Sequence, residues 1–202
     1  MPKGRLESFA DGIFAFAATL LILNIAVDQG RPLGPQLLDN WTSYAAYAVS
    51  FITIGIIGSN HHQLMHQLSH TDRTFGMITV FFLMFIAFIP FPTRLLALDL
   101  RTSNAEAAAI VYGVTLTCVA LLFNAMWWYA VWRHRLIRSD ADPRVIDGIS
   151  RSYLLGPSSY AVATAVALLS PQASAALYAL IAVFYVFESS LFGRRSSGNP
   201  AQ

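Results

Sequence analysis

Long apolar stretches separated by short polar loops follow one another along the whole chain. A helix needs roughly 20 apolar residues to cross a bilayer, and six stretches come close to that length. We place the predicted spans at residues 8–27, 41–60, 75–96, 106–132, 152–169 and 173–192. The last two are rich in alanine and serine, and Pro171 separates them. The pattern predicts an all-α integral membrane protein with six transmembrane helices in one domain.

The composition supports a protein embedded in a lipid bilayer. Hydrophobic residues make up 55% of the 202 positions and charged residues only 12%, whereas a soluble domain carries about a quarter charged residues. The net charge of +2 is too small to indicate a nucleic-acid partner. The single cysteine, Cys118, excludes an intrachain disulfide.

The distribution of basic residues predicts the orientation of the chain. With the N-terminus in the cytoplasm, ten of the 13 lysine and arginine residues lie on the cytoplasmic side. Such a bias is typical of membrane proteins, and it arises here only if the number of spans is even. We therefore expect both termini to be cytoplasmic.

An acidic residue lies close to the start of the first predicted span. Asp11 follows Arg5, Phe9 and Ala10 and directly precedes Gly12 and the apolar stretch. An ionised side chain is costly in lipid and usually marks function there. Two interpretations remain open. The acid forms a helix capping box with the serine three residues earlier, or it pairs with Arg5 of its own or a neighbouring subunit.

Part of the first span forms a stripe on one side of a helix. The residues that share this stripe, about 80° wide, are Ser8, Gly12, Phe16, Thr19, Leu23 and Ala26. Leu20 lies beside it. A stripe of this kind suits a packing face, in which Thr19 bonds the backbone carbonyl one turn back, as well as the wall of a narrow pore. Periodicity alone does not distinguish these two interpretations.

Histidines concentrate at the end of the second span. His62, His66 and His70 repeat every four residues, which predicts one helical face carrying three imidazoles. A polar helix end, a pH-sensing cluster and a transition-metal site are the alternatives. No cysteine or glutamate cluster completes a ligand set, so we predict no bound metal.

The first span also resembles a known family. The pattern Arg5-x-x-x-Phe9-x-Asp11-Gly12 is similar to the first-helix signature, Arg-x-x-x-Phe-Ser-Asp-Gly, of the potassium channel family named after transmembrane protein 175. His61 resembles a family histidine that lies near the cytoplasmic face. The resemblance therefore implies that these five residues form a motif network.

The resemblance extends to a second segment and implies an architecture. Residues 82–94, which contain a Pro-Phe-Pro-Thr stretch, look like the end of the family's third helix. In related channels the first helices of all subunits line the pore, and the animal members carry two six-helix repeats and pair as dimers. The resemblance implies that this single-repeat chain forms a homotetramer in a prokaryotic plasma membrane. Potassium would be the permeant ion, and no cofactor is expected.

The resemblance further implies roles for residues of the stripe. Phe16 matches the pore constriction, Leu20 and Leu23 match further apolar pore positions, and Thr19 matches a threonine that contributes to cation preference. The chain contains no Thr-Val-Gly-Tyr-Gly filter, so we expect its selectivity for potassium over sodium to be modest.

Three positions depart from the family pattern. Ala10 replaces the motif serine, Gly58 stands where a tryptophan is often found, and Phe16 stands where relatives usually have isoleucine or leucine. A proton-conducting variant of the pore and a secondary transporter remain as alternatives. Transporter helices are often broken near mid-membrane, whereas the first span has no Pro or Gly between Ile13 and Val27. No nucleophile elbow, zinc-helix motif or phosphate loop suggests an enzyme.

Overall fold

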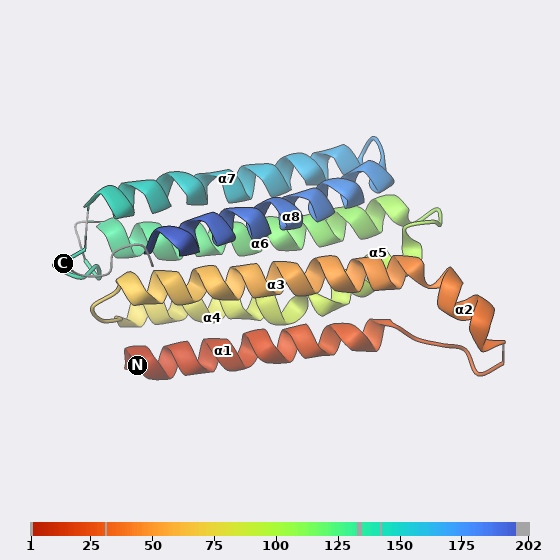
Figure 1. Ribbon diagram of the computed structural model, residues 1–202, viewed down its shortest axis with the longest axis horizontal. Helices are drawn as coiled ribbons and strands as arrows, with labels where there is room; N and C mark the ends of the chain where they lie inside the picture. Colours follow the sequence, from red (N-terminus) through yellow and green to blue (C-terminus); the bar gives the residue numbers. More distant parts are fainter. Residues whose placement is uncertain (1, 31, 133–134, 142, 197–202) are drawn as a thin grey trace.

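The computed structural model describes residues 2–30, 32–132, 135–141 and 143–196 as a bundle of helices. The long helices run side by side, and α1 begins at the end of the bundle at which α8 finishes (Figure 1). In chain order the elements are α1 (Lys3–Leu20), the 3-10 helix η1 (Leu21–Asn24), α2 (Leu33–Asp39), α3 (Trp41–Gln67), α4 (Arg73–Phe88), α5 (Pro90–Asp99), α6 (Ala105–Val131), α7 (Pro143–Ala167) and α8 (Pro171–Ser196).

Four helical segments are long and apolar enough to cross a membrane. They are Lys3–Asn24, Trp41–Gln67, Arg73–Asp99 and Ala105–Val131, and they confirm an all-α protein built for lipid. In α8 a shorter apolar helix, Pro171–Phe187, lies in the region of the sixth predicted span. The spans assigned to α7 and α8 stay predictions.

The first helix starts earlier than the apolar pattern suggests. It begins at Lys3, with Pro2 as its N-cap and no capping side chain. Ser8 therefore lies inside the helix, where its hydroxyl donates to the Gly4 carbonyl at 3.0 Å. The capping-box interpretation of Asp11 is wrong, because the helix start that such a box requires lies two turns away.

The core of the bundle is organised around α6, with α1 at its margin. The helix α6 contacts α4, α5, α7 and α8, whereas α1 packs mainly against α3 and α4. Gly113 permits the close approach of α7 and α8, since a side chain there would collide with Tyr178 and Thr164. A buried hydroxyl cluster joins α3, α5 and α6, because Ser50 lies 2.9 Å from Thr93 and 3.0 Å from Tyr112.

A break near Pro90 divides the third predicted span into α4 and α5. Proline has no N–H to donate, which weakens a helix at that point. The buried Asn24 at the end of η1 uses this region, since its side-chain amide donates to the Pro90 carbonyl at 3.2 Å. The Asn40 side chain bonds the Ala26 carbonyl at 3.0 Å. This end of the bundle, which we call the Asn24 end, is closed by side chains that bond backbone carbonyls.

At the opposite end, which we call the Lys3 end, two loops are joined through their backbones. Residues 67–69 pair with residues 136–138, and Leu68 and Ile137 form the bridge. The Ser69 amide donates to the Leu136 carbonyl at 2.9 Å, and the Arg138 amide donates to the Gln67 carbonyl at 3.0 Å. We call these paired segments the strap. Arg31 and Arg133, two of the basic residues used to predict orientation, lie outside the described residues.

Asp72 fastens α4 to α6 beside the strap. Its carboxylate caps α4 by accepting the Phe75 amide at 2.8 Å, and it accepts the Tyr129 hydroxyl at 2.6 Å. Arg135 donates to the same hydroxyl at 3.1 Å. Desolvation raises the pKa of the Asp72 carboxyl, but the hydrogen bonds from Phe75 and Tyr129 and the charge of Arg135 outweigh it. The pKa of Asp72 therefore lies below its usual value.

Candidate pore-lining helix

One face of α1 is buried against the rest of the subunit. Its residues repeat every three or four positions, as expected for one side of a helix. They are Leu6, Ala10, Phe14 and Ala17, and Leu21 of η1 continues the face. Two alanines on this face have no exposed surface, and such small residues allow neighbouring helices to pack closely. The family serine position, here Ala10, therefore belongs to this packed face.

The opposite face of α1 is uncovered in the subunit. Phe9 is 47% exposed, Phe16 61% and Leu23 70%, and Gly12 and Thr19 are exposed beside them. This face contains the stripe of the sequence analysis, so the stripe does not pack within its own subunit. The neighbouring Leu20 is half-buried at the border between the two faces.

Thr19 combines a local hydrogen bond with an accessible oxygen. Its hydroxyl donates to the Phe16 carbonyl at 2.8 Å, which is the contact expected of a threonine on a packing face. A hydroxyl has one proton and two lone pairs. Because the proton is directed at the backbone, the lone pairs of this exposed residue stay available to a cation. The local bond and a pore-lining role are therefore compatible.

Behind the exposed stripe, a ring stack holds α1 against α3 and α4. The Phe14 ring lies 5.6 Å from the His61 ring and 6.0 Å from the Phe82 ring. His61 stacks on Phe82 with an interplanar angle of 10°. Gly58 lies beside this arrangement, because a Cβ there would lie 3.4 Å from Phe14, in ordinary van der Waals contact. The position that departs from tryptophan, Gly58, thus borders the aromatic residue of α1.

His61 is fully buried, and neither ring nitrogen has a hydrogen-bond partner among the described residues. Asp11 lies close enough to interact with it electrostatically. The structure thus brings these two motif residues together from α1 and α3. Arg5 and Asp11 are both exposed, and no ion pair joins them in the described part of the subunit.

A contact between a carboxylate and an imidazole, which sequence reasoning missed, lies one turn from Asp11. Glu7 of α1 reaches the Nδ1 atom of His62 on α3 at 2.9 Å. The spacing of four residues between Glu7 and Asp11 puts both acids on the side of α1 that faces α3. The spacing of these acids, together with the two adjacent histidines, was the feature of the sequence that could have predicted this contact.

The predicted three-histidine face does not form. The helix α3 ends at Gln67, so His70 lies beyond it, where its Nδ1 atom is 2.9 Å from the Ser69 hydroxyl. His62 and His66 are exposed on the helix. Within the described residues, no group of three or more His, Cys, Asp or Glu side chains is arranged to hold a metal ion.

The fold and this helix define a helical membrane protein with a candidate pore-lining face. Residues 5–90 match the family described as endosomal/lysosomal potassium channel TMEM175. The chain is 36% identical to a potassium channel of Chamaesiphon minutus, over 93% of this chain and 95% of the relative. It is 37% identical to a potassium channel of Streptomyces collinus, over 98% of both chains. The chain belongs to the TMEM175 family.

A solved structure supports the same assignment. The crystal structure of a lysosomal potassium-selective channel TMEM175 homolog from Chamaesiphon minutus superimposes with a TM-score of 0.85 at 34% sequence identity. The match covers 93% of this chain and 97% of the other. The similarity therefore extends over nearly the whole bundle, including the helices that surround α1.

Proposed function

We propose that this chain is the subunit of a potassium-permeable channel whose pore is enclosed by the α1 helices of several copies. The observation that carries the proposal is the uncovered stripe of α1, which lies opposite the buried face of the same helix. The TMEM175 family consists of ion channels, and the two relatives above are named potassium channels. This assignment argues against an enzyme and favours the channel over the transporter alternative.

An oligomer follows from the geometry of a single subunit. One helix cannot enclose a pore, and α1 lies at the margin of the bundle (Figure 1). Closed symmetry around a shared axis would bring several copies of the stripe together. Two copies of a double-repeat animal relative would contain four first helices. Four copies of this single-repeat chain contain the same number, so we propose a homotetramer.

The stripe supplies both parts of a selective gate. Rings of Phe16 and Leu23 would form an apolar neck that closes by excluding water, with Leu20 supporting it from the border. The hydroxyls of Thr19, between those rings, would replace part of the hydration shell of a passing potassium ion. Since hydroxyls offer fewer oxygens than a carbonyl ladder, selectivity over sodium would be modest.

The motif network would stabilise the wall of the pore. Phe9 and Gly12 continue the exposed face towards the Lys3 end, and Asp11 lies on the flank of α1 beside His61. An exposed carboxylate at a subunit boundary requires a cation or water. We propose that Arg5 of a neighbouring subunit supplies that cation.

The proposed topology has six spans, with α7 and α8 as the fifth and sixth. Both termini would be cytoplasmic in a plasma membrane, which agrees with the excess of basic residues on that side. The Lys3 end of the bundle would then be the cytoplasmic end. Its strap and ion pairs would lie in water or among lipid headgroups.

The proposal is tested by ion flux from purified protein in liposomes. A potassium gradient drives efflux, a proton-coupled dye reports it, and valinomycin provides the maximal signal. We expect potassium flux without any counter-substrate and a lower signal when sodium replaces potassium. If protons as the only permeant ion give a signal as large as the potassium gradient does, the result would favour the proton-conducting variant. Flux that requires a second solute would contradict the channel and indicate a transporter.

A further inference from the structure

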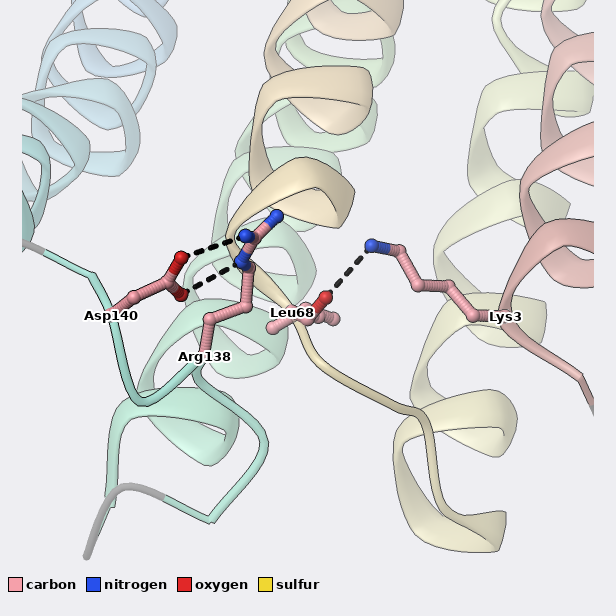
Figure 2. A network of polar contacts seen from close by, with 4 residues as sticks. All are labelled: Lys3, Leu68, Arg138 and Asp140. Carbon is pink, nitrogen blue, oxygen red and sulfur yellow. Dashed lines mark hydrogen bonds and ion pairs between the residues drawn. The ribbon is translucent and has the colours of Figure 1, made fainter.

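A lysine at the start of α1 reaches across to the strap. The Nζ atom of Lys3 donates to the Leu68 carbonyl at 2.7 Å in a half-buried position (Figure 2). Lys3 lies three residues before Leu6 and so on the inward-facing side of α1. The ammonium group therefore points away from the exposed stripe and towards the rest of the subunit.

The acceptor of this bond belongs to a well-fixed part of the structure. The Leu68 side chain is buried, and its amide already donates to the Met65 carbonyl at 3.1 Å. The partner segment of the strap is also held, because Leu136 and Ile137 are buried. The turn that follows is closed by two bonds of 3.0 and 2.8 Å between the Arg138 guanidinium and Asp140 (Figure 2). Lys3 thus connects α1 to a frame made of α3, α4 and α6.

Other polar contacts at this end of α1 are weaker. The pair between Glu7 and His62 has a histidine side chain that is 64% exposed, and solvent screens such pairs strongly. Pro2 provides no side-chain cap. The Lys3 bond is therefore the better-shielded polar anchor of the first turn within the described residues.

The Asn24 end of the same helix is held differently. Asn24 is buried and bonds the Pro90 carbonyl with a short, stiff side chain. Lys3 is a long and flexible side chain that ends at a half-buried carbonyl. The Asn24 end is therefore held by a short, stiff side chain, and the Lys3 end is held by a long, flexible one.

We propose that Lys3 is a positioning residue of the gate. Its bond to the strap holds the Lys3 end of α1 against the frame, while the Asn24 end acts as the pivot. When the bond breaks, the Lys3 ends of the α1 helices are free to move towards the shared axis, and the ring of Phe16 side chains narrows. The strap thereby couples the connection between α6 and α7 to the pore. This inference rests on the proposed function, since it takes α1 as the pore wall.

The test compares single-channel recordings with hydrogen exchange on the same purified proteins. Lys3→Met removes the donor and keeps the apolar stem, whereas Lys3→Arg keeps a donor. Arg73→Met is the matched control, because Arg73 is an exposed cation at the same end, on α4. We expect Lys3→Met to lower the open probability by at least about fivefold, since every subunit loses one typical hydrogen bond. Conductance of the open channel should stay unchanged.

Hydrogen exchange reports on the tether independently of conduction. Amides in the first two turns of α1 should exchange faster in Lys3→Met, while those around Asn24 keep their rate. Lys3→Arg should restore both readouts, and Arg73→Met should alter neither. Unchanged exchange in Lys3→Met would overturn the tether. Faster exchange with an unaltered open probability would overturn its role in gating. A wild-type protein that conducts no ions would instead contradict the proposed function, and the exchange data would still decide the tether.

Discussion

The two faces of α1 are both apolar, yet only one is covered by the subunit. Leu6 and Phe14 are buried against α3 and α4, whereas Phe16 and, in the following η1, Leu23 are largely exposed. In water such an exposed face would be a defect, but in a membrane it is tolerated because lipid is as apolar as the side chains. Hydrophobicity therefore identifies the helix without saying what covers each face.

The chemistry of the two faces separates them more clearly than their polarity. The buried face places alanines between larger residues, so backbone and rings interlock. The exposed face carries aromatic and aliphatic groups next to a glycine and the Thr19 hydroxyl, and motif charges lie along its flank. A surface that only met lipid would not need a hydroxyl or charges. The difference supports the proposal that the exposed face meets other copies and ions.

The largest effect is expected from breaking the buried face. Phe14→Ala removes a ring that contacts His61 and Phe82 and leaves a cavity. Buried Phe-to-Ala changes cost about 3–5 kcal/mol in soluble proteins, so we expect poor yield and a clearly lower melting temperature in detergent. Gly58→Ala, which adds a methyl group beside the same ring, is the milder companion. A native melting temperature for Phe14→Ala would show that the ring stack does not hold α1.

The second largest effect is expected from a substitution on the exposed face. It should change the potassium current and leave the stability almost unchanged. Phe16→Ala should leave the melting temperature close to that of the wild type and raise potassium flux several-fold, because the apolar neck loses its bulk. Phe184→Ala on α8 is the matched control, since its ring is 59% exposed, against 61% for Phe16. Flux assays in liposomes measure both variants. Equal flux from the wild type and Phe16→Ala would remove Phe16 from the gate.

The long helices of this fold were predictable from local pattern, but their ends and the short helix α2 were not. Apolar length located the four segments that are long and apolar enough to cross a membrane. The start of α1 at Lys3 was missed because the polar residues before residue 8 look like a loop, although lysine and arginine can extend a helix into the headgroup region. The end of α3 was missed for a tertiary reason. Backbone pairing in the strap takes residues 68 and 69 out of the helix and leaves His70 outside it.

The candidate site shows the same division between local and long-range information. The exposed stripe follows from helical spacing, and the roles expected for Phe16 and Thr19 follow from family resemblance. The contact of Phe14 with Gly58 and His61 joins residues that are far apart in the sequence. One amino-acid sequence contains no indication of such a contact apart from the unusual glycine. The hydrogen bond of Lys3 was equally unpredictable. Its acceptor is a backbone carbonyl, which every residue carries, so no residue type in the sequence indicates the partner.

A smaller effect is expected when only the hydroxyl of the exposed face is changed. Thr19→Val keeps the shape of the side chain and removes its oxygen, so the pore should still open. The permeability ratio of potassium to sodium should fall about two- to threefold, because a hydroxyl contributes only part of the ion's coordination. Reversal potentials under bi-ionic conditions measure this ratio. Thr19→Ser retains the oxygen and should keep the wild-type value; an unchanged ratio in Thr19→Val would exclude Thr19 from selectivity.

The smallest effect is expected from a substitution outside α1, at Asp72, whose carboxylate fastens α4 to α6. Because the pKa of Asp72 is lowered in the folded protein, its ionised form stabilises the fold above the ordinary aspartate pKa. That contribution is lost as the pH falls through the folded-state pKa. Asp72→Asn still caps α4 and should cost less than about 1 kcal/mol near neutral pH, since solvent screens the charge.

Melting temperatures measured between neutral and strongly acidic pH test this assignment. The wild type should lose its small advantage over Asp72→Asn as the solution becomes acidic, and flux at neutral pH should be equal for the two proteins. A stability difference that persists unchanged in acid would contradict an ionic role for Asp72. A large change in flux would mean that the frame, and not only the two faces of α1, sets the conformation of the pore. The comparison between the faces would then have to include the contacts of α4 with α6.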